Sequence, residues 1–254
     1  MTIKIVAFDG DDTLWHHNNF FRKASDDFHA IMNRLGDFPD AREQLDKKHI
    51  ADLPVWGYGV KGLILTMIEL SISMTQGKIP ASVIQEIFDM GRNTHMHPVT
   101  LLDYVADTIK DLHGKYRLML ITKGDLIAQE MKIHKSGLEP LFNDIDIVSE
   151  KDVPTYDRIF RRAQINPEEL LMIGNSLRSD VLPPVQLGAQ AVHIPYVTDW
   201  HFETAELTED EQKRFITLGT MEHLPEIIEN FNRSDKKLIS ELAEPALLHI
   251  GRYN

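Results

Sequence analysis

Short apolar runs that end in polar residues recur along the chain and predict the strands of a parallel sheet. The first run, residues 3–8, is rich in β-branched side chains and stops at a cluster of carboxylates. Short continuous runs of this kind are typical of strands buried on both faces. The alternation of such runs with helix-like segments predicts an α/β fold, a three-layer α/β/α sandwich around a parallel sheet. The later runs are residues 116–121, 145–148, 170–173, 190–195 and 215–218.

The segment between the first and second runs has a different, helical pattern. Residues 20–35 and 57–74 carry apolar side chains three or four positions apart, and a further helix is predicted from Pro80. We therefore expect an all-helical cap, residues 16–96, inserted into a core domain of residues 1–15 and 97–232, with a C-terminal tail at 233–254. Helices of the core are expected at residues 98–112, 126–135, 157–164, 179–187 and 224–231.

The composition is that of an ordinary globular protein. Of the 254 residues, 43% are apolar and 26% are charged, and the formal net charge is −12. This charge argues against binding to nucleic acid or to an anionic membrane surface. The absence of cysteine excludes disulfides and thiol chemistry. The N-terminus does not resemble a signal peptide and the apolar stretch at 63–70 is too short to cross a bilayer, so we expect a cytoplasmic protein. Its oligomeric state stays open between a monomer and a homodimer.

Asp9 and Asp11 directly follow the first run and are the first candidates for chemistry. In open α/β sheets, ligands bind at the carboxyl ends of the strands. Side chains two positions apart in an extended chain point the same way, and Gly10 between them permits a sharp turn. Because neighbouring carboxylates repel each other, the pair favours a bound cation such as Mg²⁺. An acidic turn or a helix cap is the alternative, and we favour it for Asp12 alone.

This stretch resembles the first motif of the haloacid dehalogenase superfamily, Asp-x-Asp-x-Thr-Leu. The matching residues are Asp9, Asp11, Thr13 and Leu14. The resemblance implies that Asp9 is a nucleophile and that Asp11 is a general acid/base. It also implies a Rossmann-like core, with a helical cap after the first motif that closes over the site.

Two further strand ends resemble the second and third motifs of the superfamily. Thr122 ends the second apolar run, and its hydroxyl is expected to bind phosphoryl oxygens together with the backbone of Lys123 and Gly124. Lys151 follows the third run and is expected to neutralise the nucleophile and the transferring group. A helix cap at Thr122 and a surface lysine at Lys151 are the ordinary alternatives.

The fourth strand end has the most detailed resemblance. Residues 174–180, Gly-Asn-Ser-Leu-Arg-Ser-Asp, resemble the superfamily's Gly-Asp-Ser-x-x-x-Asp motif, with Asn175 where Asp is usual. An amide carbonyl still suits a hard cation. The resemblance implies a Mg²⁺ site formed by Asp9, the backbone carbonyl of Asp11, and either Asn175 or Asp180. A helix cap is the alternative role for Asp180.

The four motifs together imply a Mg²⁺-dependent phosphohydrolase that cleaves a small phosphorylated metabolite through an aspartyl-phosphate. A phosphomutase shares all four motifs and remains an alternative. A 2-haloacid dehalogenase has the same nucleophile but lacks the second Asp and uses no metal, so Asp11 counts against it. A non-enzymatic binding protein is a third class, which the intact Asp9, Asp11, Thr122 and Lys151 disfavour.

Overall fold

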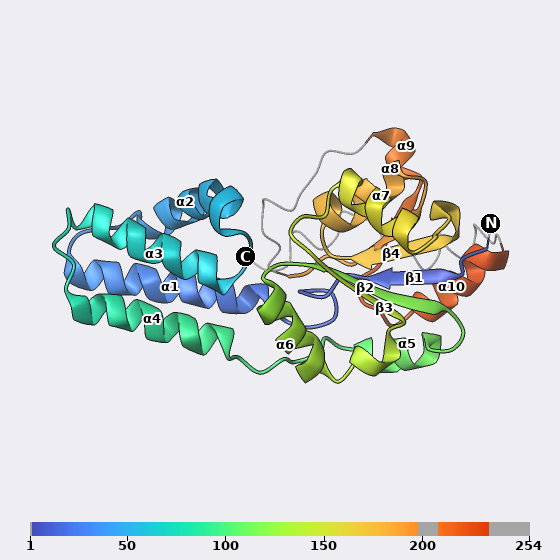
Figure 1. Ribbon diagram of the computed structural model, residues 1–254, viewed down its shortest axis with the longest axis horizontal. Coiled ribbons are helices and arrows are strands. Elements are labelled where there is room, and N and C mark those ends of the chain that lie inside the picture. The colour runs from blue at the N-terminus through green and yellow to red at the C-terminus, as the bar shows by residue number, and fades with distance from the viewer. Residues whose placement is uncertain (1, 198–207, 234–254) are drawn as a thin grey trace. The chain divides into compact units, whose positions relative to one another are not determined.

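The chain divides into two compact units, which we call the α/β unit and the helical unit (Figure 1). The computed structural model describes residues 2–197 and 208–233. The α/β unit comprises Met1–His16, Val99–Lys123 and Gln129–Asn254, and the helical unit comprises His17–Pro98 and Gly124–Ala128.

The predicted C-terminal tail, residues 233–254, lies outside the described residues except for Arg233. Across the two described ranges, no helix is long and apolar enough to cross a membrane.

Six strands form one parallel sheet among the described residues, and this confirms the predicted fold class. The order across the sheet is β3-β2-β1-β4-β5-β6. Every residue of β1 is buried, as expected for an apolar strand with a neighbour on each side. The strands are β1 (Ile5–Phe8), β2 (Arg117–Lys123), β3 (Asp144–Val148), β4 (Leu170–Gly174), β5 (Gln190–His193) and β6 (Phe215–Thr217).

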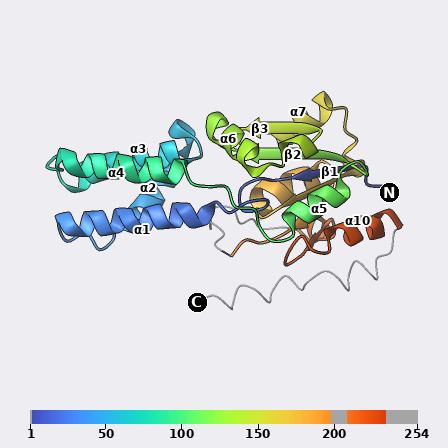
Figure 2. The ribbon, with the colours of Figure 1, turned by 90° about the horizontal axis from the view of Figure 1, so that it is seen from below.

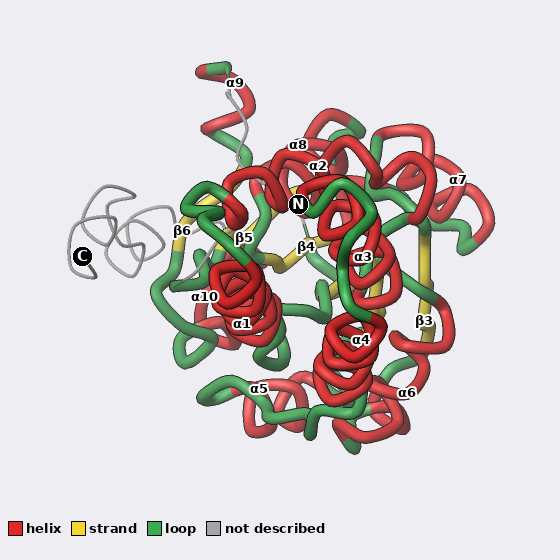
Figure 3. The backbone as a smooth tube through the Cα atoms, turned by 90° about the vertical axis from the view of Figure 1, so that its left-hand side faces the viewer, coloured by secondary structure: helices red, strands yellow, loops and turns green. Residues whose placement is uncertain are grey.

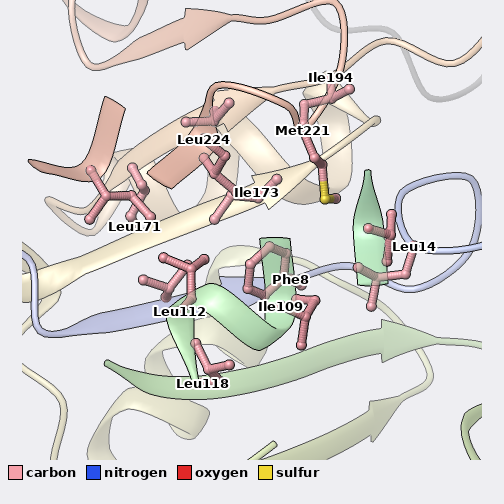
Figure 4. Packing of buried hydrophobic residues seen from close by; sticks show 14 of the residues in the cluster. Phe8, Leu14, Ile109, Leu112, Leu118, Leu171, Ile173, Ile194, Met221 and Leu224 are labelled. Carbon is pink, nitrogen blue, oxygen red and sulfur yellow. The ribbon is translucent and has the colours of Figure 1, made fainter. Parts of the chain in front are cut away.

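Alternate residues of β1 enter two different hydrophobic cores, because side chains of a strand point to opposite faces in turn. Phe8 lies in one core with Ile109 of α5 (Figure 4). Ala7 lies in the other core with Tyr156 of α7. Figure 2 shows α5 and α10 side by side. These helices and their neighbours are α5 (Val105–Leu112), α6 (Leu126–Ser136), α7 (Val153–Arg162), α8 (Leu182–Gln186), α9 (Glu209–Gln212) and α10 (Leu224–Arg233).

The helical unit has its own hydrophobic core. Phe28 of α1, Met67 of α3 and Ile87 of α4 are fully buried in it. Figure 3 looks nearly along α1, α3 and α4. A Cβ atom at Gly91 would lie 1.7 Å from Cδ1 of Ile64, so this glycine permits the close approach of α4 to α3. The helices are α1 (Asn18–Leu35), α2 (Ala41–Trp56), α3 (Val60–Met74) and α4 (Ala81–His95).

The helix predicted at residues 98–112 is shorter than expected and begins at Val105. Before it, the chain runs beside the loop that follows β1. The backbone N–H of His16 donates to the carbonyl of Thr100 over 3.0 Å, and the N–H of Leu102 donates to the carbonyl of Leu14 over 3.0 Å. These contacts with a segment far away in the sequence replace the first turns of the predicted helix.

Two helices that follow strands also differ from the prediction. α7 begins at Val153, because Asp152 caps it by accepting a hydrogen bond from the N–H of Thr155 over 2.9 Å. The helix predicted at 179–187 is instead a π-helical turn, Leu177–Val181, followed by α8. Such turns are rare and are often found at functional sites.

Candidate active site

The loop after β1 begins while the chain is still bonded to the sheet. The N–H of Asp9 donates to the carbonyl of Ile173 on β4 over 2.9 Å, and the N–H of Leu14 then donates back to the carbonyl of Gly10 over 2.8 Å. A Cβ atom at position 10 would lie 2.8 Å from the ring of Trp15. Glycine is therefore required at this tight turn, and the turn fixes Asp9 at the carboxyl edge of the sheet.

Lys151 lies between two carboxylates in the interior of this edge. Its ammonium is 2.5 Å from Oδ1 of Asp9 and 2.7 Å from Oδ1 of Asp180, and all three side chains are buried. Burial raises the pKa of Asp9 to about 7, although the Lys151 ammonium opposes the rise. Burial lowers the pKa of Lys151, but Asp180 and Asp9 outweigh this effect and keep it above its usual value. The lysine is therefore a fixed positive charge beside Asp9.

The π-helical turn after β4 places Asp180. The N–H of Ser176 donates to Oδ2 of Asp180 over 3.0 Å, while Lys151 holds the other oxygen. A Cβ atom at Gly174 would lie 2.3 Å from the Asp180 carboxylate, so only glycine fits beneath it. The hydroxyl of Tyr156 donates to the carbonyl of Ser179 over 3.1 Å and ties α7 to this turn.

Thr13 links the first and fourth strand ends. Its hydroxyl lies 3.1 Å from Oδ2 of Asp9 and 3.3 Å from Oδ1 of Asn175, and it accepts a hydrogen bond from the N–H of Asn175 over 3.1 Å. A carboxylate oxygen and an amide oxygen therefore converge on one hydroxyl. Nε2 of His193, at the end of β5, donates to the carbonyl of Asn175 over 2.9 Å, and burial lowers the pKa of this imidazole.

The hydroxyl of Thr122 is a buried hydrogen-bond donor without a partner in the interior of the described part of the α/β unit. Its side chain is fully buried at the end of β2, and its hydroxyl has no hydrogen-bond partner among the described residues. A Cβ atom at Gly10 would lie 3.1 Å from this hydroxyl, which places it beside the turn between Asp9 and Asp11. A buried hydroxyl without a partner costs free energy, on the order of 1–3 kcal/mol. The site therefore favours a ligand that brings an acceptor oxygen to Thr122.

The residues that follow Thr122 point to other parts of the chain. The ammonium of Lys123 donates to the hydroxyl of Ser179 over 2.8 Å and lies 3.7 Å from Glu150. It therefore connects the ends of β2 and β3 with the π-helical turn. Gly124 groups with the helical unit and has a φ of 143°, a conformation that favours glycine.

The carboxylate of Asp11 contacts helix α6. This carboxylate is 2.5 Å from the ammonium of Lys132, and it also accepts hydrogen bonds from Gln129 and Trp15. Sequence reasoning missed Lys132 and Gln129. Their spacing, three positions apart on a predicted helix, indicated that they share a face, but nothing in the sequence showed that this face meets Asp11.

The structure thus brings most of the predicted site residues to the carboxyl ends of neighbouring strands. Lys151, Asp9 and Asp180 form one contact group, and Asn175 joins it through Thr13. Thr122 lies beside the turn at Gly10, and Asp11 forms a second ion pair. Within the described ranges, no three acidic or histidine side chains form a metal-binding group. A cation here would depend on amide or main-chain oxygens as well as on carboxylates.

Both the sequence and the structure of this chain are similar to those of known hydrolases. A sequence model of the haloacid dehalogenase-like hydrolases matches residues 3–188. A haloacid dehalogenase-like family hydrolase from Xanthomonas campestris has a TM-score of 0.81 and 36% identity, over 92% of this chain and 93% of that chain.

Two more distant proteins are also similar over nearly their whole length. The glyceraldehyde 3-phosphate phosphatase of Methanocaldococcus jannaschii is 24% identical over 251 residues, which are 91% of this chain and 99% of that protein. The structure of the HAD-hydrolase YfnB from Bacillus subtilis, bound to magnesium, shares the fold with a TM-score of 0.63 and 18% identity, over 90% of this chain and 100% of that chain. Since the family model covers most of the sequence, the chain belongs to the haloacid dehalogenase-like hydrolases.

Proposed function

We propose that this hydrolase is a Mg²⁺-dependent phosphatase that cleaves a small phosphomonoester through an aspartyl-phosphate on Asp9. The observation that carries the proposal is the buried Thr122 hydroxyl, which has no partner and lies beside the turn that follows Asp9. A phosphoryl oxygen is an acceptor of the kind this donor lacks. The similarity to the glyceraldehyde 3-phosphate phosphatase of Methanocaldococcus jannaschii supports the same reaction class.

The residues divide the two half-reactions among them. A carboxylate oxygen of Asp9 attacks phosphorus, and the bond from phosphorus to the ester oxygen breaks. Asp11 in its protonated form gives its proton to the departing alkoxide, and as a carboxylate it then takes a proton from the water that attacks the aspartyl-phosphate. This attack forms the new bond from oxygen to phosphorus and breaks the bond from phosphorus to the Asp9 oxygen. The Lys151 ammonium, 2.5 Å from Asp9, and the Thr122 hydroxyl stabilise the charge on the transferring group. The products are the alcohol and inorganic phosphate, and Asp9 and Asp11 return to their starting states.

The donor atoms fit a hard cation. The carboxylate of Asp9 and the amide oxygen of Asn175 converge on Thr13, and oxygen donors of this kind suit Mg²⁺. Asp9, the backbone carbonyl of Asp11 and Asn175 would hold the ion, which supplies positive charge to the substrate and to the neighbouring carboxylates. Lys151 and the N–H of Ser176 already occupy the two oxygens of Asp180. We therefore assign the direct contact to Asn175. The magnesium bound to YfnB supports a metal at this fold.

The metal requirement gives the first test of the proposed reaction. We expect release of inorganic phosphate from a panel of phosphorylated sugars, nucleotides and hydroxy acids to fall to background in EDTA and to return with Mg²⁺, because uncompensated carboxylates repel an anionic substrate. Release of free phosphate separates a phosphatase from a phosphomutase. Undiminished turnover after removal of the metal, or halide release from a 2-haloacid under the same conditions, would overturn the proposal.

The amide of Asn175 allows a second, independent test. If Asn175 is a direct ligand, Asn175→Asp adds a negative charge to the donor set, and Mg²⁺ should bind several-fold more tightly. Isothermal titration with Mg²⁺ in the absence of substrate measures this change. Asn166→Asp, the same substitution at the cap of the short 3-10 helix Pro167–Glu169 that precedes β4, is the matched control and should leave the affinity unchanged. Equal affinities in Asn175→Asp and the unmodified protein would transfer the ligand role to Asp180.

A further inference from the structure

Both oxygens of the Asp11 carboxylate are held by side chains of the α/β unit. Oδ1 accepts from Nε1 of Trp15 over 2.6 Å and lies 2.6 Å from the ammonium of Lys132. Oδ2 lies 2.5 Å from the same ammonium and accepts from Nε2 of Gln129 over 2.9 Å. Trp15 and Gln129 thus contact one oxygen each, whereas Lys132 contacts both. An ammonium that spans the two oxygens fixes the plane of the carboxylate as well as its position.

The helix α6 presents this contact in a defined orientation. Gln129 and Lys132 are three positions apart and therefore lie on the same face of the helix. The side-chain amide of Gln129 also donates to the carbonyl of Lys123 over 2.7 Å, which attaches α6 to the end of β2. Gln129 is buried, and the Lys132 side chain is 15% exposed. The ammonium that holds Asp11 is therefore itself held by the packing of the helix.

We infer that Lys132 is the positioning residue of Asp11, which it holds in the orientation needed for proton transfer. This inference rests on the proposed function, in which Asp11 is the general acid/base. Trp15, Gln129 and Lys132 all donate to Asp11, so the group they hold is the ionised carboxylate, the form that takes the proton from the attacking water. A base acts efficiently when it is within hydrogen-bond reach of that proton in a fixed geometry, so a loosened carboxylate slows the hydrolysis of the aspartyl-phosphate. Lys132 itself touches neither phosphorus nor the attacking water in this account, and it acts through Asp11.

The single substitutions separate positioning from substrate binding. Lys132→Met keeps the length and apolar stem of the side chain but removes the charge. We expect kcat to fall by roughly 10- to 100-fold with KM close to the unmodified value, because a misplacement of about 1 Å has effects of this size. Lys132→Arg, which can span both oxygens, should recover most of the loss. Lys135→Met on the exposed side of the same helix is the matched control and should change neither constant.

A double-mutant cycle with Asp11→Asn decides whether Lys132 acts through Asp11. Once Asp11 has lost its proton-transfer role, Lys132→Met should cause no further loss of kcat. A further loss of the same size in that background, or a rise in KM in place of a fall in kcat, would overturn the inference while the proposed function stands. Normal turnover of Asp11→Asn alone would instead refute the acid/base role and the inference together. If Lys132→Met fails to fold, as circular dichroism would show, Lys132→Gln takes its place in the same cycle.

Discussion

Replacing Asp9 by Asn is expected to reduce phosphate release by about 10³-fold or more, because a neutral amide cannot attack phosphorus. The fold should be retained. The Lys151 ammonium, which contacts Asp9 and Asp180, keeps Asp180 as a charged partner 2.7 Å away, so the substitution leaves no buried charge uncompensated. Steady-state phosphate release measures the first effect, and thermal unfolding followed by circular dichroism measures the second.

The neighbouring Asp12 provides the control for this experiment. It has a φ of 62°, a left-handed conformation that Asn adopts readily, so Asp12→Asn should fold and turn over like the unmodified protein. Loss of activity in both variants would mean that the loop, and not the nucleophile, had been damaged. Turnover that survives in Asp9→Asn would contradict the assignment of Asp9 directly.

The second large effect is expected at Asp11. Asp11→Asn keeps the nucleophile but removes the group that protonates the alkoxide and deprotonates water, so turnover of an unactivated phosphomonoester should fall by roughly 10²-fold or more. With p-nitrophenyl phosphate, whose leaving group needs little protonation, the first half-reaction should be partly spared. Rapid-mixing kinetics would then show a burst of p-nitrophenol followed by slow release of phosphate.

Two results would contradict this role. Equal losses with the activated and the unactivated ester would show that Asp11 does not protonate the leaving group. Unchanged turnover with both esters would show that it takes no part in either half-reaction.

The fold class could be predicted because its signals are local. Residues 3–8 form an apolar run that contains β1, and the later runs gave the remaining strands to within a few residues. The start of α5 could not be predicted in this way. The backbone of residues 100 and 102 bonds to His16 and Leu14, and that contact forms only when the chain is folded.

The candidate site shows the same division between local and long-range signals. Thr122 and Lys151 follow apolar runs, and the carboxyl ends of parallel strands meet at one edge, so their proximity to Asp9 could be expected. His193 also ends a strand, and the same rule could have found it. Lys132 lies within a helix, and its partner Asp11 is 121 positions away, so no pattern along the chain pairs them.

The aspartyl-phosphate on Asp9 is the central claim, and trapping it is the most direct measurement. Asp11→Asn mixed with p-nitrophenyl phosphate and Mg²⁺, then quenched in acid, should carry a phosphate mass increment that peptide mapping by mass spectrometry assigns to Asp9. The same treatment of Asp9→Asn should give no increment. A phosphate on another residue, or turnover of Asp11→Asn without any phosphorylated enzyme, would contradict the account.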